Sequence, residues 1–179
     1  MTFFIYSALL NAFIAGLLGI VVILKNRREL INRLFFGLSI SVVFWSLGYW
    51  RWMSLDTHDA ALFWIRLLSI ASLFIPIFYF HWILTFTELN KKKAKLIASL
   101  YSLAIMLTAF SFSPLFISQV IPKLIFPFWP TPGILYGLYL AFIYLGITIY
   151  SLFILIDQYK KSEEPKKSDI RLNILSTVR

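Results

Sequence analysis

The sequence contains no cysteine, only two histidines and few charged residues. Lys, Arg, Asp and Glu make up 14% of the 179 residues, whereas 60% are hydrophobic and 18% are aromatic. The absence of cysteine excludes disulfides, thiolate metal sites and thiol catalysis. A chain with so little charge and a mean hydropathy of +0.81 lies far outside the composition of soluble domains. The sequence therefore predicts an integral membrane protein.

Motifs of enzymatic chemistry are also missing. No histidine stands beside a glutamate in a phospho-acceptor pattern, and the seven glycines are scattered in or beside apolar runs instead of forming a nucleotide lid. His58 and His81 are expected on opposite sides of the bilayer, which excludes a two-histidine metal or haem site within one chain. We expect no enzymatic activity, no cofactor and no metal.

Five apolar runs are long enough to cross a bilayer core of about 30 Å as helices. They cover residues 3–24, 34–53, 60–87, 96–116 and 134–156. A charged segment interrupted by Pro165 follows, and residues 172–179 form a stub too short to cross. The predicted fold is an all-α, polytopic helical membrane bundle, one domain over residues 1–179, with five complete transmembrane helices and a C-terminal stub.

The basic residues predict the orientation of these spans. The formal net charge is +9, but the positive residues stand in short clusters between apolar runs, so we expect topology signals and no nucleic-acid binding. Three loops hold most of them, and the other two loops hold only Arg51 and Lys123. The clustered residues are Lys25, Arg27, Arg28, Arg33, Lys91, Lys92, Lys93, Lys95, Lys160, Lys161, Lys166, Lys167 and Arg171. The positive-inside rule then places the N-terminus outside the cell.

The first two spans carry signals for close helix packing. Asn11 in the first span is either a ligand group or the donor of an interhelical hydrogen bond. In the second span, four residues on one helical stripe form a narrow face suited to a neighbouring helix. They are Gly37, Ser41, Phe44 and Gly48.

The third span, within Asp56 to Leu89, holds polar residues in an apolar run. Arg66 at a membrane centre would cost roughly 2.5–3.5 kcal/mol, so it should face protein or water. His81 follows fifteen residues later, which places it within about 60° of Arg66 around the helix and about 22 Å along it. Both should face the bundle interior. Pro76 between them has no N–H, so a kink or a freed carbonyl is expected there.

Two groups near the outer ends of these spans have alternative interpretations. The aromatic residues Trp45, Tyr49, Trp50 and Trp52 form either an interfacial belt or a cation-binding cage. The turn of residues 56–59 contains Asp, Thr, His and Asp. Its side chains either cap the third helix or ligate a divalent metal.

Residues 113–133 break the helical pattern because they contain five of the seven prolines together with Trp129. A proline-rich segment cannot cross lipid as a regular helix, since the missing backbone donors find no replacement there. We expect it to lie in the interface or over the mouth of the bundle, either as a lid or as a connector anchored by aromatic residues.

A family resemblance is carried by the second and third spans. The run FFGLSISVVFWSLGY, then FWIRLL, a proline and FHWILTF resemble the N-terminal seven-transmembrane sensor region of prokaryotic histidine kinases. The resemblance is strongest from Asn32 to Phe86. It implies a multi-pass protein of a prokaryotic plasma membrane, ending here within the sixth span, with a seventh span and cytoplasmic signalling domains to follow in a full-length protein.

The function expected from these features is a signal-input, or sensor, module without kinase domains. Arg66, Ser69 and three aromatic residues, Trp45, Tyr49 and Trp129, are the candidate ligand-binding residues. Pro76 is either a hinge or a fixed kink, and His81 either adds a pH dependence or stays neutral, bonded to a neighbouring helix. The expected partners are the lipid bilayer, a small or lipophilic ligand, cytoplasmic signalling domains and a second copy in a homodimer.

Two other functions are weighed against sensing. In a transport or channel component, Arg66 and His81 would line a polar pathway for an anion or a proton. A broken or unwound helix pair would favour that function, whereas a rigid bundle with one outer pocket would favour sensing. The third alternative is a purely structural membrane partner.

Overall fold

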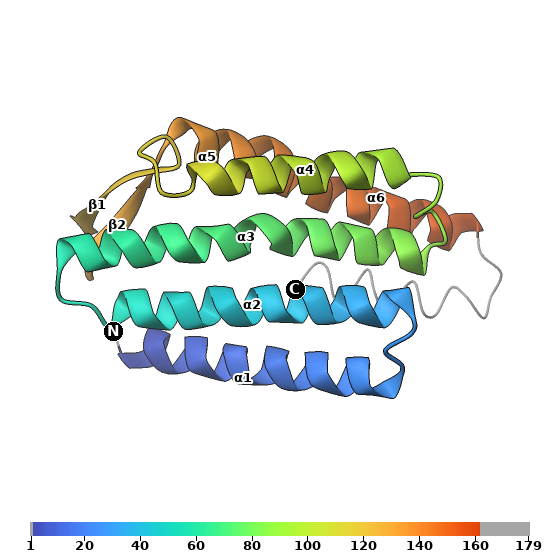
Figure 1. Ribbon diagram of the computed structural model, residues 1–179, viewed down its shortest axis with the longest axis horizontal. Coiled ribbons are helices and arrows are strands. Elements are labelled where there is room, and N and C mark those ends of the chain that lie inside the picture. Colours follow the sequence, from blue (N-terminus) through green and yellow to red (C-terminus); the bar gives the residue numbers. More distant parts are fainter. Residues whose placement is uncertain (1, 162–179) are drawn as a thin grey trace.

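The computed structural model describes residues 2–161 and is a helical bundle with one β-hairpin (Figure 1). The predicted stub at 172–179 and the break at Pro165 lie outside the described residues. The elements are α1 (Thr2–Lys25), α2 (Leu30–Met53), α3 (His58–Phe86), α4 (Ala94–Phe110), β1 (Ile117–Lys123), β2 (Phe126–Pro132), α5 (Ile134–Leu138), the π-helix η1 (Tyr139–Tyr144) and α6 (Leu145–Lys161). The last three are continuous and form the last span, Ile134–Lys161. The predicted polytopic helical bundle is confirmed.

Within residues 2–161, four helices are long and apolar enough to cross a membrane: α1, α2, α3 and the last span. The fourth predicted span, 96–116, is shorter than expected, because α4 ends at Phe110. Its 17 residues rise about 26 Å, slightly less than a typical hydrocarbon core. The helix ends where Ser113 precedes Pro114, since the residue before a proline is disfavoured in α-helical geometry.

Helix α3 lies in the middle of the molecule. In Figure 1, α1 and α2 lie on one side of it, and α4 lies on the other side, where the last span also packs. Its buried residues point toward both sides and supply much of the core. They are Ala61, Ile65, Leu68, Ser69, Leu73, Pro76, Ile77, Phe80, Ile83 and Leu84.

Glycines allow the first three helices to approach closely. A Cβ added at Gly48 would lie 2.6 Å from the Cβ of Leu68 in α3, and one added at Gly19 would lie 2.7 Å from the Cβ of Ser39 in α2. These distances are too short for any side chain, so the predicted narrow face of α2 packs against α3. Phe44 is the exception in the predicted stripe, because it is 64% exposed and lies on the surface.

Asn11 joins the first two helices, as one of its two interpretations required. Its Nδ2 donates a hydrogen bond to the hydroxyl of Ser46 at 2.8 Å. Ser46 is completely buried. A polar pair within an apolar interface fixes the register of α1 against α2, because a slip along either helix would leave both groups unpaired.

The proline-rich segment forms an antiparallel hairpin, a structure that the sequence did not predict. Ile117 pairs with Pro132 and Val120 with Pro130, and the register shifts twice along the ladder. Prolines are tolerated because a sheet of two strands has only edge strands, whose outward side needs no donor. At the tip, Leu124 adopts a positive φ of 54°.

The hairpin and the basic clusters occupy opposite ends of the bundle (Figure 1). One end holds the start of α1, the α2–α3 turn and the hairpin, and is called the hairpin end below. The other end holds the turns at 26–29 and 87–93 and the end of α6, and is called the lysine end. The loops assigned to one side of the membrane by charge therefore do share one end of the bundle.

Candidate functional site beneath the hairpin

Arg66 binds the hairpin through its guanidinium group. Its Nε and Nη2 donate to the same backbone oxygen, that of Ile117 in β1, at 3.1 Å and 2.7 Å. Arg66 is half-buried, and no carboxylate within residues 2–161 forms an ion pair with it. The sequence predicted that Arg66 faces protein or water, and the guanidinium faces protein. Its acceptor belongs to a strand of the hairpin, which the sequence did not predict.

A row of aromatic rings crosses the hairpin end from α2 to α1. Trp45 stacks on Tyr49 at 5.4 Å between ring centroids, and Trp52 contacts both Tyr49 (5.3 Å) and Trp129 (6.3 Å). The row continues from Trp129 through Phe126 to Phe4. We call these six residues the aromatic row; they are Phe4, Trp45, Tyr49, Trp52, Phe126 and Trp129. It places three of the candidate ligand residues in one chain of contacts.

Trp52 connects the two halves of this row. It is only 4% exposed, and its indole N–H donates to the carbonyl of Phe128 in β2 at 3.0 Å. Assigning Trp52 to an interfacial belt was therefore wrong, because its ring is in the core and its N–H binds the hairpin. Trp52 follows Tyr49 by three residues and Trp45 by seven, a spacing that places all three side chains on one face of a helix. This spacing could have grouped Trp52 with Tyr49 and Trp45 from the sequence alone.

Lys123 places a cation against this row. Its Nζ lies 5.6 Å from the centroid of the Trp129 ring, within the range of a cation–π contact. The face of the Trp129 ring is therefore already in contact with the chain's own Lys123. A ligand cation at Trp129 would compete with Lys123, which favours the anchoring interpretation of the aromatic group over a cation-binding cage.

Ser69 does not join Arg66 in a polar pair. Its hydroxyl is 2% exposed and donates to the carbonyl of Ile65 in its own helix at 2.6 Å. The five candidate ligand residues are therefore split three ways: an aromatic row, an arginine bound to the hairpin backbone and a serine bonded within α3.

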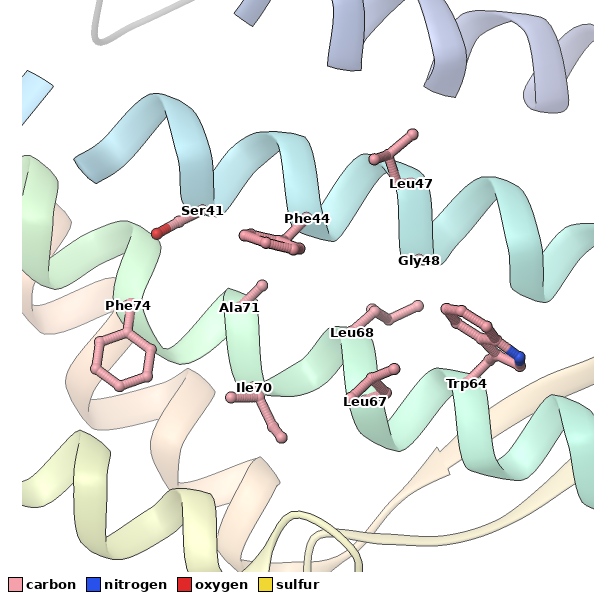
Figure 2. Close-up of a pocket in the computed structure, with 10 residues that line it drawn as sticks. All are labelled: Ser41, Phe44, Leu47, Gly48, Trp64, Leu67, Leu68, Ile70, Ala71 and Phe74. Carbon is pink, nitrogen blue, oxygen red and sulfur yellow. The ribbon is translucent and has the colours of Figure 1, made fainter. Parts of the chain in front are cut away.

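An apolar groove of about 540 Å³ lies between α2 and α3. Figure 2 shows Phe44 and Gly48 of α2 and Trp64, Leu68 and Ala71 of α3 along it. The remaining lining residues are Ser41, Leu47, Leu67, Ile70 and Phe74. None of the predicted ligand residues lines this groove. Three residues of the predicted stripe on α2 line this groove, namely Ser41, Phe44 and Gly48. From the sequence alone, that stripe predicted only a face for helix packing.

Pro76 leaves a backbone acceptor without its helical donor. In a regular helix, the carbonyl of Ser72 would accept from the N–H of residue 76, which proline lacks. The phenol of Tyr139 donates to this carbonyl at 2.9 Å and lies 3.3 Å from that of Leu73. A freed carbonyl was predicted at this point, whereas its donor from the last span was not.

His81 contacts a different element from Arg66. Arg66 bonds to β1, and His81 Nδ1 lies 3.4 Å from the hydroxyl of Tyr101 in α4. The two rings also contact edge to face at 5.9 Å between centroids. His81 therefore meets a neighbouring helix, which was one of its two predicted interpretations.

The turn before α3 provides neither of the interactions proposed for it. Thr57 is the N-cap residue, yet its side chain makes no capping hydrogen bond. His58 Nδ1 lies 3.1 Å from Asp59 Oδ1, and both side chains are exposed. Among residues 2–161, no three histidine or carboxylate side chains are grouped as a metal site would require.

The long apolar helices, the buried polar pairs between them and the clustered charges at one end define a polytopic helical membrane protein. The family profile described as the N-terminal 7TM region of histidine kinase matches residues 7–178. The chain belongs to this family. Comparison with curated proteins gave no significant match. Comparison with solved structures gave none either.

Proposed function

We propose that this chain is the membrane-embedded signal-input module of a histidine-kinase receptor. The observation that carries the proposal is the family match across residues 7–178. In the proposed receptor, cytoplasmic signalling domains follow this region and perform the phosphoryl chemistry. A homodimer is the proposed assembly.

The proposed orientation places the hairpin end outside a prokaryotic plasma membrane and the lysine end in the cytoplasm, with five crossings. The positive-inside rule supports it, because the turns at the lysine end hold ten of the basic residues within 2–161. They are Lys25, Arg27, Arg28, Arg33, Lys91, Lys92, Lys93, Lys95, Lys160 and Lys161.

Cysteine labelling tests the orientation directly, because the chain has no cysteine of its own. Lys92→Cys at the lysine end and Leu124→Cys at the hairpin tip, where Leu124 is 93% exposed, form a matched pair. A membrane-impermeant maleimide applied to intact cells should label position 124 and not position 92. Labelling at 92 alone would reverse the orientation.

The proposed mechanism carries a signal along α3. A small or lipophilic ligand bound at the hairpin end would act on the hairpin, which serves as a lid and is tied to α3 by Arg66. Pro76 divides α3 into a half near the hairpin and a half near the lysine end. A ligand with different affinities for two bends at Pro76 would shift their populations and move the inner half.

A transport or channel function is not favoured. Helix α3 is continuous from His58 to Phe86, whereas transporter sites are typically built from broken helices. Arg66 and His81 are each bonded to a different neighbour instead of facing a shared pathway.

Autophosphorylation of the complete kinase in phospholipid vesicles tests the sensor function. Arg66→Leu should change the phosphorylation rate severalfold, because it releases the hairpin from α3. Arg51→Leu is the matched control, since Arg51 lies at the same end and its side chain forms no hydrogen bond within the described residues. Equal rates in the wild type and Arg66→Leu, with both proteins folded, would contradict the proposal.

A further inference from the structure

Two irregularities of the helical backbone meet in the core. Pro76 interrupts the hydrogen-bond ladder of α3, and η1 interrupts the last span with a π-helical turn. They are joined by one side chain, Tyr139, which is the first residue of η1 and is 3% exposed. Its hydroxyl donates to the carbonyl that Pro76 leaves without a donor, that of Ser72.

Among the side chains of residues 2–161, the hydroxyl of Tyr139 donates to the carbonyl of Ser72. The serine's own hydroxyl is turned away, because it donates to the carbonyl of Ser69 at 2.7 Å. A buried carbonyl without a donor costs free energy, and lipid offers no water to replace one. Tyr139 is thus the residue of the last span that donates to this backbone carbonyl, whereas Tyr136 bonds to the side-chain hydroxyl of Ser72.

The π-helical turn explains how Tyr139 reaches this position. The residues of α6 that are buried are Ile147, Ser151, Ile154 and Leu155. In a uniform α-helix, Tyr139 would lie about 80° around the axis from Ile147. A π-helical turn holds one extra residue, and removing one step of about 100° brings Tyr139 to within about 20° of Ile147. Tyr139 then faces α3 together with the buried stripe of α6.

We propose that Tyr139 is a latch that fixes the proline site of α3 to the register of the last span. While its hydroxyl is bonded to Ser72, bending of α3 at Pro76 moves α6 with it. When the bond is broken, the two helices move independently. The latch itself stands on the geometry alone, and its use in signalling rests on the function proposed above.

A double-mutant cycle on the full chain in detergent tests the latch. Tyr139→Phe removes only the hydroxyl and should lower the melting midpoint by about 2–4 °C, the shift expected for one hydrogen bond in a chain of this size. Pro76→Ala restores an N–H to Ser72. In the Pro76→Ala background, Tyr139→Phe should lower the melting midpoint by less than half of its effect in the wild type, because the carbonyl of Ser72 then accepts from the new N–H. Equal losses in both backgrounds would overturn the latch.

Tyr144→Phe is the matched control, because Tyr144 lies in the same π-helix and is 40% exposed. It should leave the melting midpoint within about 1 °C of the wild type. If Tyr144→Phe lowered the midpoint as much as Tyr139→Phe, the effect would belong to tyrosines in this turn generally, and the latch would be rejected.

Spin labels test the coupling even if Pro76→Ala fails to fold. Glu88→Cys after α3 and Lys160→Cys in α6 carry the labels, in vesicles of phosphatidylethanolamine and phosphatidylglycerol. Tyr139→Phe should broaden or shift the distance distribution, while Tyr144→Phe should not. An unchanged distribution in Tyr139→Phe would overturn the coupling. If the double-mutant cycle and the spin-label distances both support the latch, but Arg66→Leu leaves the autophosphorylation rate unchanged, only the proposed function is contradicted.

Discussion

Helix α3 meets its neighbours in two different ways. Toward α2 it packs by steric fit, since Gly48 and Gly37 leave room for Leu68 and Phe78. Toward the hairpin and the last span it has side-chain hydrogen bonds at Arg66 and Ser72, and toward α4 it has the ring contact of His81 with Tyr101. A tightly packed face resists displacement, because any shift produces overlap. The other face is also packed, because buried residues of α4, the hairpin and the last span belong to the core, but its hydrogen bonds are discrete contacts that can break and re-form.

This difference suggests a division of labour within the bundle. Helices α1, α2 and α3 form a unit joined by glycine contacts and by the Asn11–Ser46 pair. The hairpin, α4 and the last span are attached to that unit by contacts at three depths along α3. Relative movement is therefore expected between these two groups of elements and not within the first.

The largest expected effect comes from filling the tightly packed face. Gly48→Val should lower the free energy of unfolding by an amount near the upper end of roughly 1–3 kcal/mol, because its Cβ would overlap the Cβ of Leu68. Gly146→Val, whose added Cβ would meet nothing within 4 Å, should change it by less than about 0.5 kcal/mol. Thermal unfolding in detergent measures both. If Gly48→Val and Gly146→Val destabilised the protein equally, the face of α3 toward α2 would not be tightly packed.

A smaller effect is expected from releasing the hairpin. Hydrogen bonds to charged groups contribute about 1.5–3 kcal/mol to stability. Because Arg66 is only half-buried, the contribution of its hydrogen bonds should be at or below the lower end of this range. Arg66→Leu should therefore increase the mobility of a spin label at Leu124→Cys without unfolding the helices. Arg51→Leu serves as the control. A label equally immobile in all three proteins would show that Arg66 does not hold the hairpin.

The smallest effect is expected at His81. Its 3.4 Å separation from the Tyr101 hydroxyl exceeds the usual hydrogen-bond range, so ring packing is its main contribution. His81→Phe should change the free energy of unfolding by less than about 0.5 kcal/mol, whereas His81→Ala should cost more through lost packing. If both cost the same, the hydrogen bond would matter more than its length indicates.

The sequence alone determined the membrane character, the helical bundle and the grouping of loops at two ends. These features follow from local hydropathy, run length and charge, which do not depend on distant residues. For Asn11 it offered two interpretations, and the structure shows the interhelical bond. The family resemblance came from motifs within two adjacent spans.

Only the tertiary structure decided what those residues contact. The bonds from Arg66 to Ile117, Trp52 to Phe128 and Tyr139 to Ser72 join positions 51, 76 and 67 residues apart. The prolines of residues 113–133 excluded a helix, but only pairing between the two strands turned the segment into a hairpin. Regular helical spacing even places Tyr139 about 80° from the buried stripe of α6. A backbone irregularity that depends on packing against α3 was needed to bring its hydroxyl to Ser72.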